Sequence, residues 1–377
     1  MSKWPRKYVI GLTGNIATGK SVVRRMLEHL GAYGIDADAL SHRAIARGAP
    51  GYQSAIETFG KWILDSNGEV DRTKLGRMVF NDAEALTQLE TIVHPLVEQA
   101  VDLIVRRASQ RVIVIEAIKL LEGKLAGACD SIWVTFASEA VQKARLMSKR
   151  NLTEADALQR IRAQSAQEIK TTAANVIIQN AGSFEATWNQ VVTAWKVISP
   201  VSDTTPIIMK KAEAGELSVQ RGRPRDSAQI AALTTRLSGG TRPQSNADIM
   251  AAFGEKAFML LKSGSQLMGL AGWQVENLVA RTTDMFIDPS VPFPGAIKIL
   301  ITEVETASRD LQCEASLVFL APQMAAQEAL WKELGYERRS PQTLGVQAWQ
   351  DAAVESMPPN TILLFKQLRQ DRVLRPI

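Results

Sequence analysis

The most constraining feature of the chain is a loop at residues 14–21 with the spacing G-x-x-x-x-G-K-S. The apolar run at residues 8–12 precedes the loop, and a stretch typical of a helix, residues 22–30, follows it. A strand that continues through such a loop into a helix presents backbone N–H groups and the positive end of the helix to a polyphosphate. The pattern predicts a nucleotide-binding site; the alternative is a tight turn without a ligand.

The residues of this loop have separate expected roles. Lys20 is expected to reach the β- and γ-phosphates, and the hydroxyl of Ser21 to bind Mg²⁺. The other members surround the phosphates mainly with backbone N–H groups. The predicted cofactor-binding residues are Gly14, Asn15, Ile16, Ala17, Thr18, Gly19, Lys20, Ser21 and Val22.

Length and composition indicate a globular protein of about two domains. The chain has 377 residues, of which 46% are hydrophobic and 22% charged, values that exclude disorder as its main state. The net charge is +5 without any run of five like charges, which favours a phosphorylated small molecule over a nucleic acid as partner.

Cysteine content and hydropathy bear on the compartment. The two cysteines, Cys129 and Cys313, lie far apart, so we expect reduced thiols instead of a disulfide framework. The chain has no apolar signal core at its start and no apolar run of about 18 residues. These features predict a cytoplasmic protein without a membrane partner.

The pattern of elements predicts an α/β fold in two parts. Five short β-type runs alternate with longer helical stretches in the first half, which favours a parallel sheet with helices on both faces. These runs are residues 8–12, 33–36, 111–117, 132–136 and 176–179. The helical excursion at residues 39–109 is too long for a simple crossover and predicts a substrate lobe over the strand ends. Residues 139–172 are rich in charged and amide side chains and predict a pair of lid helices.

A segment with two prolines and small polar residues predicts a linker at residues 199–206. It divides the chain into a first domain, residues 1–198, and a second domain, residues 207–377. The second domain reads as mixed α/β. Its expected strands are residues 217–221, 258–261, 266–274, 284–287, 315–320 and 361–368, and its expected helices are residues 227–237, 296–311 and 324–334.

Two carboxylates follow the second strand of the first half. Asp36 and Asp38 are two residues apart, so they share one face if the strand continues through both. A carboxylate at this edge of the sheet can accept the proton of an attacking hydroxyl or hold Mg²⁺ through water. The alternative is that one of them caps the helix that follows.

Two further residues are candidates for contact with the second substrate. Glu116 ends a strongly apolar strand, where a carboxylate is expected to point to the metal or to the substrate; the alternative is an ion pair with Lys119. His94 precedes Pro95 inside the helical excursion, and it is either a substrate contact or a structural residue at a helix break.

The predicted lid carries a cluster of cations. Arg145, Lys149 and Arg150 lie in its first part, and Arg160 and Arg162 lie further along. One arginine that closes over a transferring phosphoryl group stabilises the charge of the transition state. We expect the others to form a solvated helix face.

These features together resemble the dephospho-CoA kinase family over residues 6–196. The motifs that carry the resemblance are Gly11-Leu12-Thr13-Gly14, Gly19-Lys20-Ser21, Ile35-Asp36-Ala37-Asp38, Phe59-Gly60, Asp71-Arg72, Val79-Phe80, Leu89-Glu90, His94-Pro95, Arg160-Ile161, Ala163-Gln164 and Asn180-Ala181-Gly182. The resemblance implies transfer of the γ-phosphoryl of ATP to the 3′-hydroxyl of dephospho-CoA. It also implies that Asp38 is the general base, that the helical excursion binds the CoA moiety and that the arginine-rich helices are the lid.

The chain departs from the family pattern at several positions. Asn15 and Ala17 stand where glycines are usual, and Val22 stands where threonine is usual. The lid arginine of the family falls on Lys149, with Arg150 beside it, and which of the two closes on phosphate is open. Lys119 and its neighbours replace a usual Pro-Leu-Leu after Glu116. A regulatory P-loop ATPase is the alternative function, but it leaves the other motifs unexplained.

The second half resembles an N-acetyltransferase of the GNAT type. The resemblance rests on the order of the expected elements and on residues 329–337. The loop that would bind the pyrophosphate of acetyl-CoA, residues 291–296, has one glycine and two prolines, and prolines lack the N–H donors that phosphates need. We therefore expect cofactor binding to be lost or altered. Three hypotheses remain: an active acetyltransferase in a bifunctional enzyme, a non-catalytic domain that senses CoA or acetyl-CoA, and an interaction module.

Overall fold

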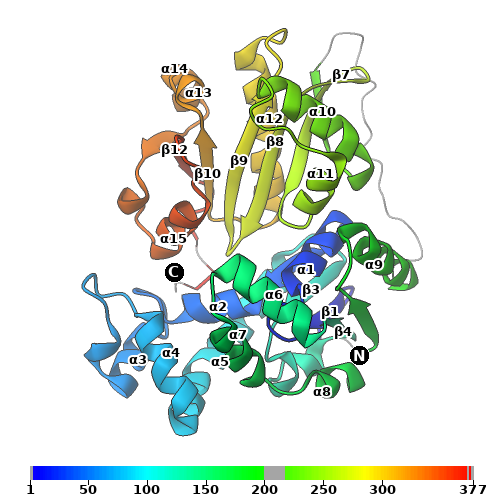
Figure 1. The fold of residues 1–377 in the computed structure, drawn as a ribbon. Helices are drawn as coiled ribbons and strands as arrows, with labels where there is room; N and C mark the ends of the chain where they lie inside the picture. The colour runs from blue at the N-terminus through cyan, green and yellow to red at the C-terminus, as the bar shows by residue number, and fades with distance from the viewer. Residues whose placement is uncertain (1–2, 199–216, 372, 375–377) are drawn as a thin grey trace.

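The computed structural model describes residues 3–198, 217–371 and 373–374, so the predicted linker at 199–206 lies outside the described residues (Figure 1). The first half holds a five-stranded sheet of order β2-β3-β1-β4-β5 in which every neighbouring pair is parallel. Its strands are β1 Tyr8–Thr13, β2 Tyr33–Asp36, β3 Val112–Glu116, β4 Ser131–Phe136 and β5 Val176–Gln179. The predicted parallel sheet is confirmed.

Helices cover both faces of this sheet because its central strands are apolar throughout. Every residue of β3 is buried, as is β1 after Tyr8. Helices α1 (Lys20–His29) and α9 (Phe184–Ile198) share one hydrophobic core with the sheet, and the substrate lobe contributes to a second. Strand β1 lies between β3 and β4, so its carboxyl end is the switch point at which ligands bind in open α/β sheets.

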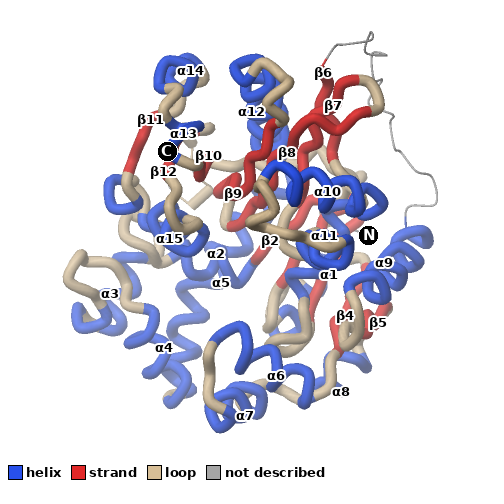
Figure 2. The backbone as a smooth tube through the Cα atoms, turned by 45° about the horizontal axis from the view of Figure 1, so that its top comes forward, coloured by secondary structure: helices blue, strands red, loops and turns tan. Residues whose placement is uncertain are grey.

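The helical excursion forms the expected lobe, and the lid region forms three helices instead of two (Figure 2). The lobe comprises α2 Ala37–Ala44, α3 Tyr52–Phe59, η1 Lys61–Ile63, α4 Arg72–Asn81 and α5 Ala83–Arg107. The lid comprises α6 Glu139–Arg150, α7 Glu154–Arg162 and α8 Gln167–Thr172. Two short turns, η2 Leu120–Glu122 and η3 Ala126–Ala128, connect β3 to β4.

Of the two alternatives for His94 and Pro95, the helix break is wrong, because α5 continues through Pro95. A proline inside a helix costs about 3 kcal/mol. Buried valines on both sides of it, Val93, Val97 and Val101, attach the helix to the core of the first half. Their burial offsets the proline and keeps the helix in one piece.

The second half holds a seven-stranded mixed sheet of order β11-β12-β10-β9-β8-β7-β6, in which β9 and β10 are parallel. The strands are β6 Leu217–Arg221, β7 Ala257–Ser263, β8 Gln266–Glu276, β9 Val279–Ile287, β10 Ala315–Leu320, β11 Glu337–Arg339 and β12 Ile362–Gln367. The helices are η4 Pro224–Asp226, α10 Ser227–Leu237, α11 Asn246–Ala252, α12 Phe293–Asp310, α13 Pro322–Ala325, α14 Glu328–Glu333, η5 Pro341–Thr343 and α15 Gln347–Ser356.

Alternating residues of β7 show how both faces of this sheet are covered. Met259 and Leu261 belong to the core under α12, while Phe258 and Leu260 belong to the core under α10 and α11. Because successive strand residues point to opposite faces, the two cores lie on opposite sides. The predicted α/β class of the second half is confirmed.

Two local expectations for the second half are wrong. Strand β9 begins at Val279 instead of residue 284, and the helix expected at 324–334 is the two short helices α13 and α14. The sequence patterns also missed α15, whose buried face is made of Trp349, Ala352 and Ala353. Small alanines give a weak hydrophobic period, so this helix is specified chiefly by the surface it covers.

The second half packs directly against β2, the edge strand of the first sheet. The Tyr33 hydroxyl donates to the Leu311 carbonyl at 2.9 Å, and Gln312 donates to the Ile104 carbonyl at 2.9 Å. Arg43 donates to both carboxylate oxygens of Glu314 at 2.7 Å, and the Glu314 side chain is 1% exposed. An exposed strand edge invites pairing with another chain, so this contact also protects the first sheet. Within the described ranges, no helix is long and apolar enough to span a membrane.

Candidate functional site

The loop between β1 and α1 has the backbone geometry of a phosphate cradle. Gly14 and Gly19 have φ angles of 151° and 89°, which favour glycine. Ala17 has a φ of 59°, in the left-handed region, where a non-glycine residue costs about 1–2 kcal/mol. The alanine at this position is therefore accommodated with backbone strain.

Lys20 lies inside the loop that precedes it. Its ammonium donates to the carbonyls of Gly14 at 3.1 Å and Asn15 at 3.3 Å, and its side chain is buried. Burial lowers the pKa of Lys20, and the charges of Glu116 and Asp38 oppose that effect. The lysine thus places a positive charge in the concave side of the loop.

The lid also reaches the loop. The Ile16 N–H donates to the Gln164 side chain at 2.7 Å, and the Asn15 side chain donates to the Ser165 carbonyl at 2.9 Å. Gln164 belongs to the segment between α7 and α8. The Ile16 N–H is therefore occupied by the lid, and a phosphate would have to displace Gln164 to bind it.

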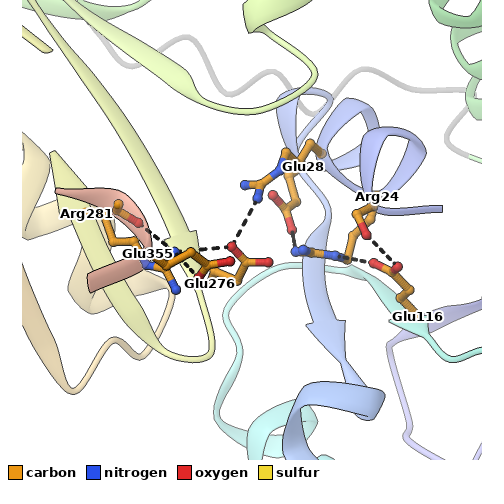
Figure 3. Close-up of polar contacts among 9 residues, drawn as sticks. Arg24, Glu28, Glu116, Glu276, Arg281 and Glu355 are labelled. Carbon is orange, nitrogen blue, oxygen red and sulfur yellow. Dashed lines mark hydrogen bonds and ion pairs between the residues drawn. The ribbon is translucent and has the colours of Figure 1, made fainter. Parts of the chain in front are cut away.

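Glu116 ends β3 with both carboxylate oxygens directed at α1, as Figure 3 shows. Ser21 donates its hydroxyl to one oxygen at 2.8 Å, and Arg24 donates from Nε to the other at 2.7 Å. The side chains of Arg24 and Glu116 are 4% and 5% exposed. The alternative prediction, an ion pair between Glu116 and Lys119, is wrong, because Lys119 instead donates a hydrogen bond to Glu90 at 2.8 Å.

Asp36 and Asp38 do not share a strand face, because the strand ends at Asp36. Asp36 is the N-cap of α2 and accepts the Ala39 N–H at 2.8 Å, so the capping alternative is confirmed for this residue. Asp38 lies in the first turn of α2 and accepts the Ile118 N–H at 3.0 Å. Burial and then the Glu116 charge raise the pKa of Asp36 to about 6, and burial raises the pKa of Asp38.

Lys170 is a site residue that the sequence patterns missed. It lies in α8 and donates to the Ile118 carbonyl at 3.0 Å, while the Ile118 N–H donates to Asp38, so the backbone of Ile118 lies between the two side chains. Burial and then the Lys20 charge lower the pKa of Lys170 to about 8. Only the folding of α8 over β4 brings it here, and a lone lysine in a polar helix gives no earlier signal.

The lid cations divide into different roles. Arg145 donates to the carbonyls of Ala17 at 3.0 Å and Asn180 at 2.7 Å, which anchors the loop to the strand ends. Lys149 lies 3.8 Å from Glu255 of the second half, and both side chains are exposed. Arg150 is close enough to Lys20 for its charge to lower the pKa of that lysine.

His94 is exposed on α5, one turn after Glu90. Glu90 bonds to Lys119, which follows the end of β3. Residues four apart share a helix face, so His94 lies on the face of α5 that meets the carboxyl end of the sheet.

A chain of charged contacts continues from the loop into the second half (Figure 3). Arg24 bonds to Glu28 at 2.6 Å, and the neighbouring Arg25 lies 3.7 Å from Glu276 at the end of β8. Glu276 lies 3.6 Å from Arg281, which bonds to Glu355 of α15 at 3.0 Å. The outer face of α1 is therefore tied to the second half.

Comparison with known families concerns the first half. The family model described as dephospho-CoA kinase matches residues 8–186. A dephospho-CoA kinase of Carboxydothermus hydrogenoformans is 41% identical over 194 residues, which cover 50% of this chain and 94% of the relative. A dephospho-CoA kinase of Moorella thermoacetica is 37% identical over 193 residues, which cover 50% of this chain and 91% of the relative.

Solved structures resemble each half. A dephospho-CoA kinase from Campylobacter jejuni has a TM-score of 0.39 at 25% identity and covers 52% of this chain and 98% of its own. An acetyltransferase of the GNAT family from Staphylococcus aureus has a TM-score of 0.32 at 10% identity and covers 41% of this chain and 100% of its own.

Replacing Glu116 by glutamine tests the assignment of its ion pair. Glu116→Gln removes one of the two carboxylates that neutralise the buried Arg24 and leaves only Glu28, so we expect the free energy of unfolding in urea to fall by about 3 kcal/mol. The matched control is Lys119→Gln, which removes the exposed pairs with Glu90 and Glu122 and is expected to cost about 1 kcal/mol or less. Equal losses in the two variants would contradict the assignment.

Proposed function

The chain belongs to the dephospho-CoA kinase family and is a phosphotransferase, and from that premise we propose how its residues transfer the γ-phosphoryl of ATP to the 3′-hydroxyl of dephospho-CoA. The observation that supports the proposal is the position of Asp38, which the Ile118 N–H holds within electrostatic reach of Lys20. It brings a base from the substrate lobe to the phosphate loop.

Asp38 is the general base in this proposal. Its carboxylate takes the proton of the 3′-hydroxyl while the oxygen bonds to the γ-phosphorus and the bond to the β-phosphate oxygen breaks. Burial raises the pKa of Asp38, which makes the carboxylate a stronger base. The Ile118 N–H keeps one face of it fixed, and the nearby Lys170 balances its charge.

The loop and its lysine bind the transferred group. The backbone of residues 14–22 surrounds the phosphates, and Lys20 approaches the β- and γ-phosphates from inside the loop. Glu116 and Asp36 shape the floor of the acceptor site, where each is held by bonds to the chain itself. We place His94 at the rim of the same site.

The residues beside Ser21 fit Mg²⁺, although no group of three or more His, Cys, Asp or Glu side chains that could hold a metal occurs in the described part of the chain. Mg²⁺ needs few protein ligands when phosphates and waters complete its shell. The Ser21 hydroxyl oxygen would bind the ion. Glu116 accepts a hydrogen bond from this hydroxyl, with 2.8 Å between the two oxygens. When bound, the ion neutralises charge on the phosphates.

The second half is proposed to be a separate domain, residues 207–377, without acetyl transfer. Helix α12 starts with Pro292 as its N-cap and Pro294 in its first turn, so donors are few. Bonds from the Ser290 side chain and backbone hold the pKa of Asp288 at about 2, so a carboxylate lies in the cavity beside this helix start. Arg236 pairs with this carboxylate at 2.6 Å, so it is the missing N–H donors that disfavour a diphosphate there. CoA sensing at another surface of this domain and a role as an interaction module are the remaining alternatives.

The proposal assigns both substrates and the compartment. The substrates are ATP and dephospho-CoA. We place the reaction in the cytoplasm, because Cys129 and Cys313 are free thiols and a reducing compartment keeps thiols free.

The first test is the kinase reaction itself. Purified protein with ATP and Mg²⁺ is expected to form CoA from dephospho-CoA, and Asp38→Asn is expected to lower kcat by about 10²–10⁴-fold. Lys20→Ala is expected to abolish turnover. Since the pKa of Asp38 is raised, wild-type kcat should fall as the pH drops through that raised value. Unchanged turnover in Asp38→Asn would remove this residue from the base role.

The lid variants separate the two adjacent cations. Arg150→Ala is expected to lower kcat by about 10³-fold, because a bidentate arginine stabilises transition-state charge. Lys149→Ala is expected to stay within about twofold of wild type, since it removes an exposed contact with Glu255. A larger loss in the lysine variant would reverse the assignment.

Acetyl transfer can be measured directly on the full chain. We expect no release of CoA from acetyl-CoA above the uncatalysed rate in the presence of polyamines, amino acids or amine-bearing peptides. Catalysed release would contradict the assignment of the second half. The same CoA-release assay is run on Pro294→Gly, which restores one backbone N–H donor at the start of α12, and its rate is compared with that of the wild type.

A further inference from the structure

A tight turn of the second half reaches the helix that follows the glycine-rich loop. The turn joins β8 to β9 through Asn277 and Leu278, with Glu276 paired to Val279 across its base. The two turn residues have φ angles of 53° and 61°. Turns of this kind favour glycine at the second position, so the buried Leu278 is held there under strain. Such strain points to a turn that is retained for what it contacts.

The turn contacts both α1 and the substrate lobe. Glu276 lies 3.7 Å from Arg25, and Figure 3 shows Glu276 facing α1. The Asn277 carbonyl accepts a hydrogen bond from Arg43 of the lobe at 2.9 Å. The side chain of Asn277 lies on a small cavity between the halves, and the turn forms one of its walls.

This cavity has the size of a site for one water molecule. Its volume is about 40 Å³, close to the share of one water in the liquid. Its charged lining consists of one guanidinium and three carboxylates, namely Arg24, Glu28, Asp36 and Glu276. The carboxylates disfavour an anion and the guanidinium disfavours a cation, so a small neutral molecule fits the lining best.

Two buried polar groups on the lining are complementary to a water. Across the parts of the chain that the structure describes, Nη2 of Arg24 and Oδ1 of Asn277 have no hydrogen-bond partner. The other two nitrogens of Arg24 donate to Glu116 and Glu28. Buried groups of this kind are usually satisfied by an ordered water. A water in the cavity can accept from the guanidinium and donate to the amide oxygen.

Arg24 connects the cavity to the phosphate site. Its Nε donates to one oxygen of Glu116 at 2.7 Å, and Ser21 donates to the other oxygen at 2.8 Å. A guanidinium is planar and rigid, so a bond that fixes Nη2 also fixes the direction of Nε. The position of the Ser21 hydroxyl is therefore coupled to the turn through two side chains.

We propose that Asn277 is a positioning residue for the kinase site, and that it acts on Ser21 through one water in this cavity and through Arg24 and Glu116. The inference rests on the proposed function, because it takes Ser21 as the residue that would bind Mg²⁺ with the nucleotide. The second half is then an interaction module that completes the phosphate site from outside, without contact with either substrate.

The test removes the Asn277 side chain and keeps the turn. Asn277→Gly suits the positive φ and retains the carbonyl that Arg43 binds. We expect the Kd for ATP with Mg²⁺ to rise about three- to tenfold, the value of one hydrogen bond to a charged group. The Kd for ATP with a chelator present should stay within twofold, because only the Ser21 contact is displaced. Calorimetry measures both constants, and kcat should fall by the same factor.

Gln312→Gly is the matched control. Gln312 also has a positive φ, 58°, and it donates from the second half to the Ile104 carbonyl of the first half at 2.9 Å. It does not line the cavity. Loss of its side chain weakens the contact between the halves without reaching Arg24, so both Kd values and kcat are expected to stay within twofold of wild type.

A crystal structure of the full chain gives an independent measurement. We expect one water within about 3.2 Å of both Nη2 of Arg24 and Oδ1 of Asn277. A dry cavity, an unchanged Kd in Asn277→Gly, or equal changes in the two glycine variants would overturn the proposal. Failure of the wild-type protein to phosphorylate dephospho-CoA would overturn the proposed function instead, since the effect on nucleotide binding is measured without the acceptor.

Discussion

The buried ion pair between Arg24 and Glu116 is the interaction on which the site depends. It joins α1 to the end of β3, with both side chains almost entirely removed from water. Burial of two charges is costly unless each finds its partners in good geometry. The bonds from Ser21 and Arg24 satisfy both carboxylate oxygens only when helix and strand keep one relative position, whereas Nη2 of Arg24 has no hydrogen-bond partner among the residues described. The loop between β1 and α1 is held at the same end.

The second half extends this arrangement by covering the edge of the first sheet. Arg43 in the substrate lobe pairs with the buried Glu314, while Arg25 on α1 lies beside Glu276. The lobe that carries Asp38, the proposed base, and the helix that follows the glycine-rich loop are therefore both attached to the second half. A lobe fixed in this way presents Asp38 to the loop with little loss of conformational entropy on binding.

Local chemistry explains how far the sequence predicted the site. The strand, loop and helix around Lys20 were predicted because apolar runs and glycines act over a few residues. Asp36 could not be assigned in advance, since a cap and a site carboxylate use the same residue type at the same position. Arg24 had a detectable signal: it follows Ser21 by three residues and so shares its helix face. Lys170 had none, because its partner, the Ile118 carbonyl, is 52 residues away.

The sequence by itself determined the nucleotide loop, the parallel sheet of the first half and the separation of a second α/β part, because each depends on short-range patterns of hydrophobicity and turn residues. The tertiary structure alone decided that Glu116 pairs with Arg24 and not with Lys119. It also decided that α15 lies beside the substrate lobe, where Asp351 contacts Arg72. Those outcomes depend on which distant surfaces can be buried together with all their charges satisfied. No local pattern in the chain records that choice.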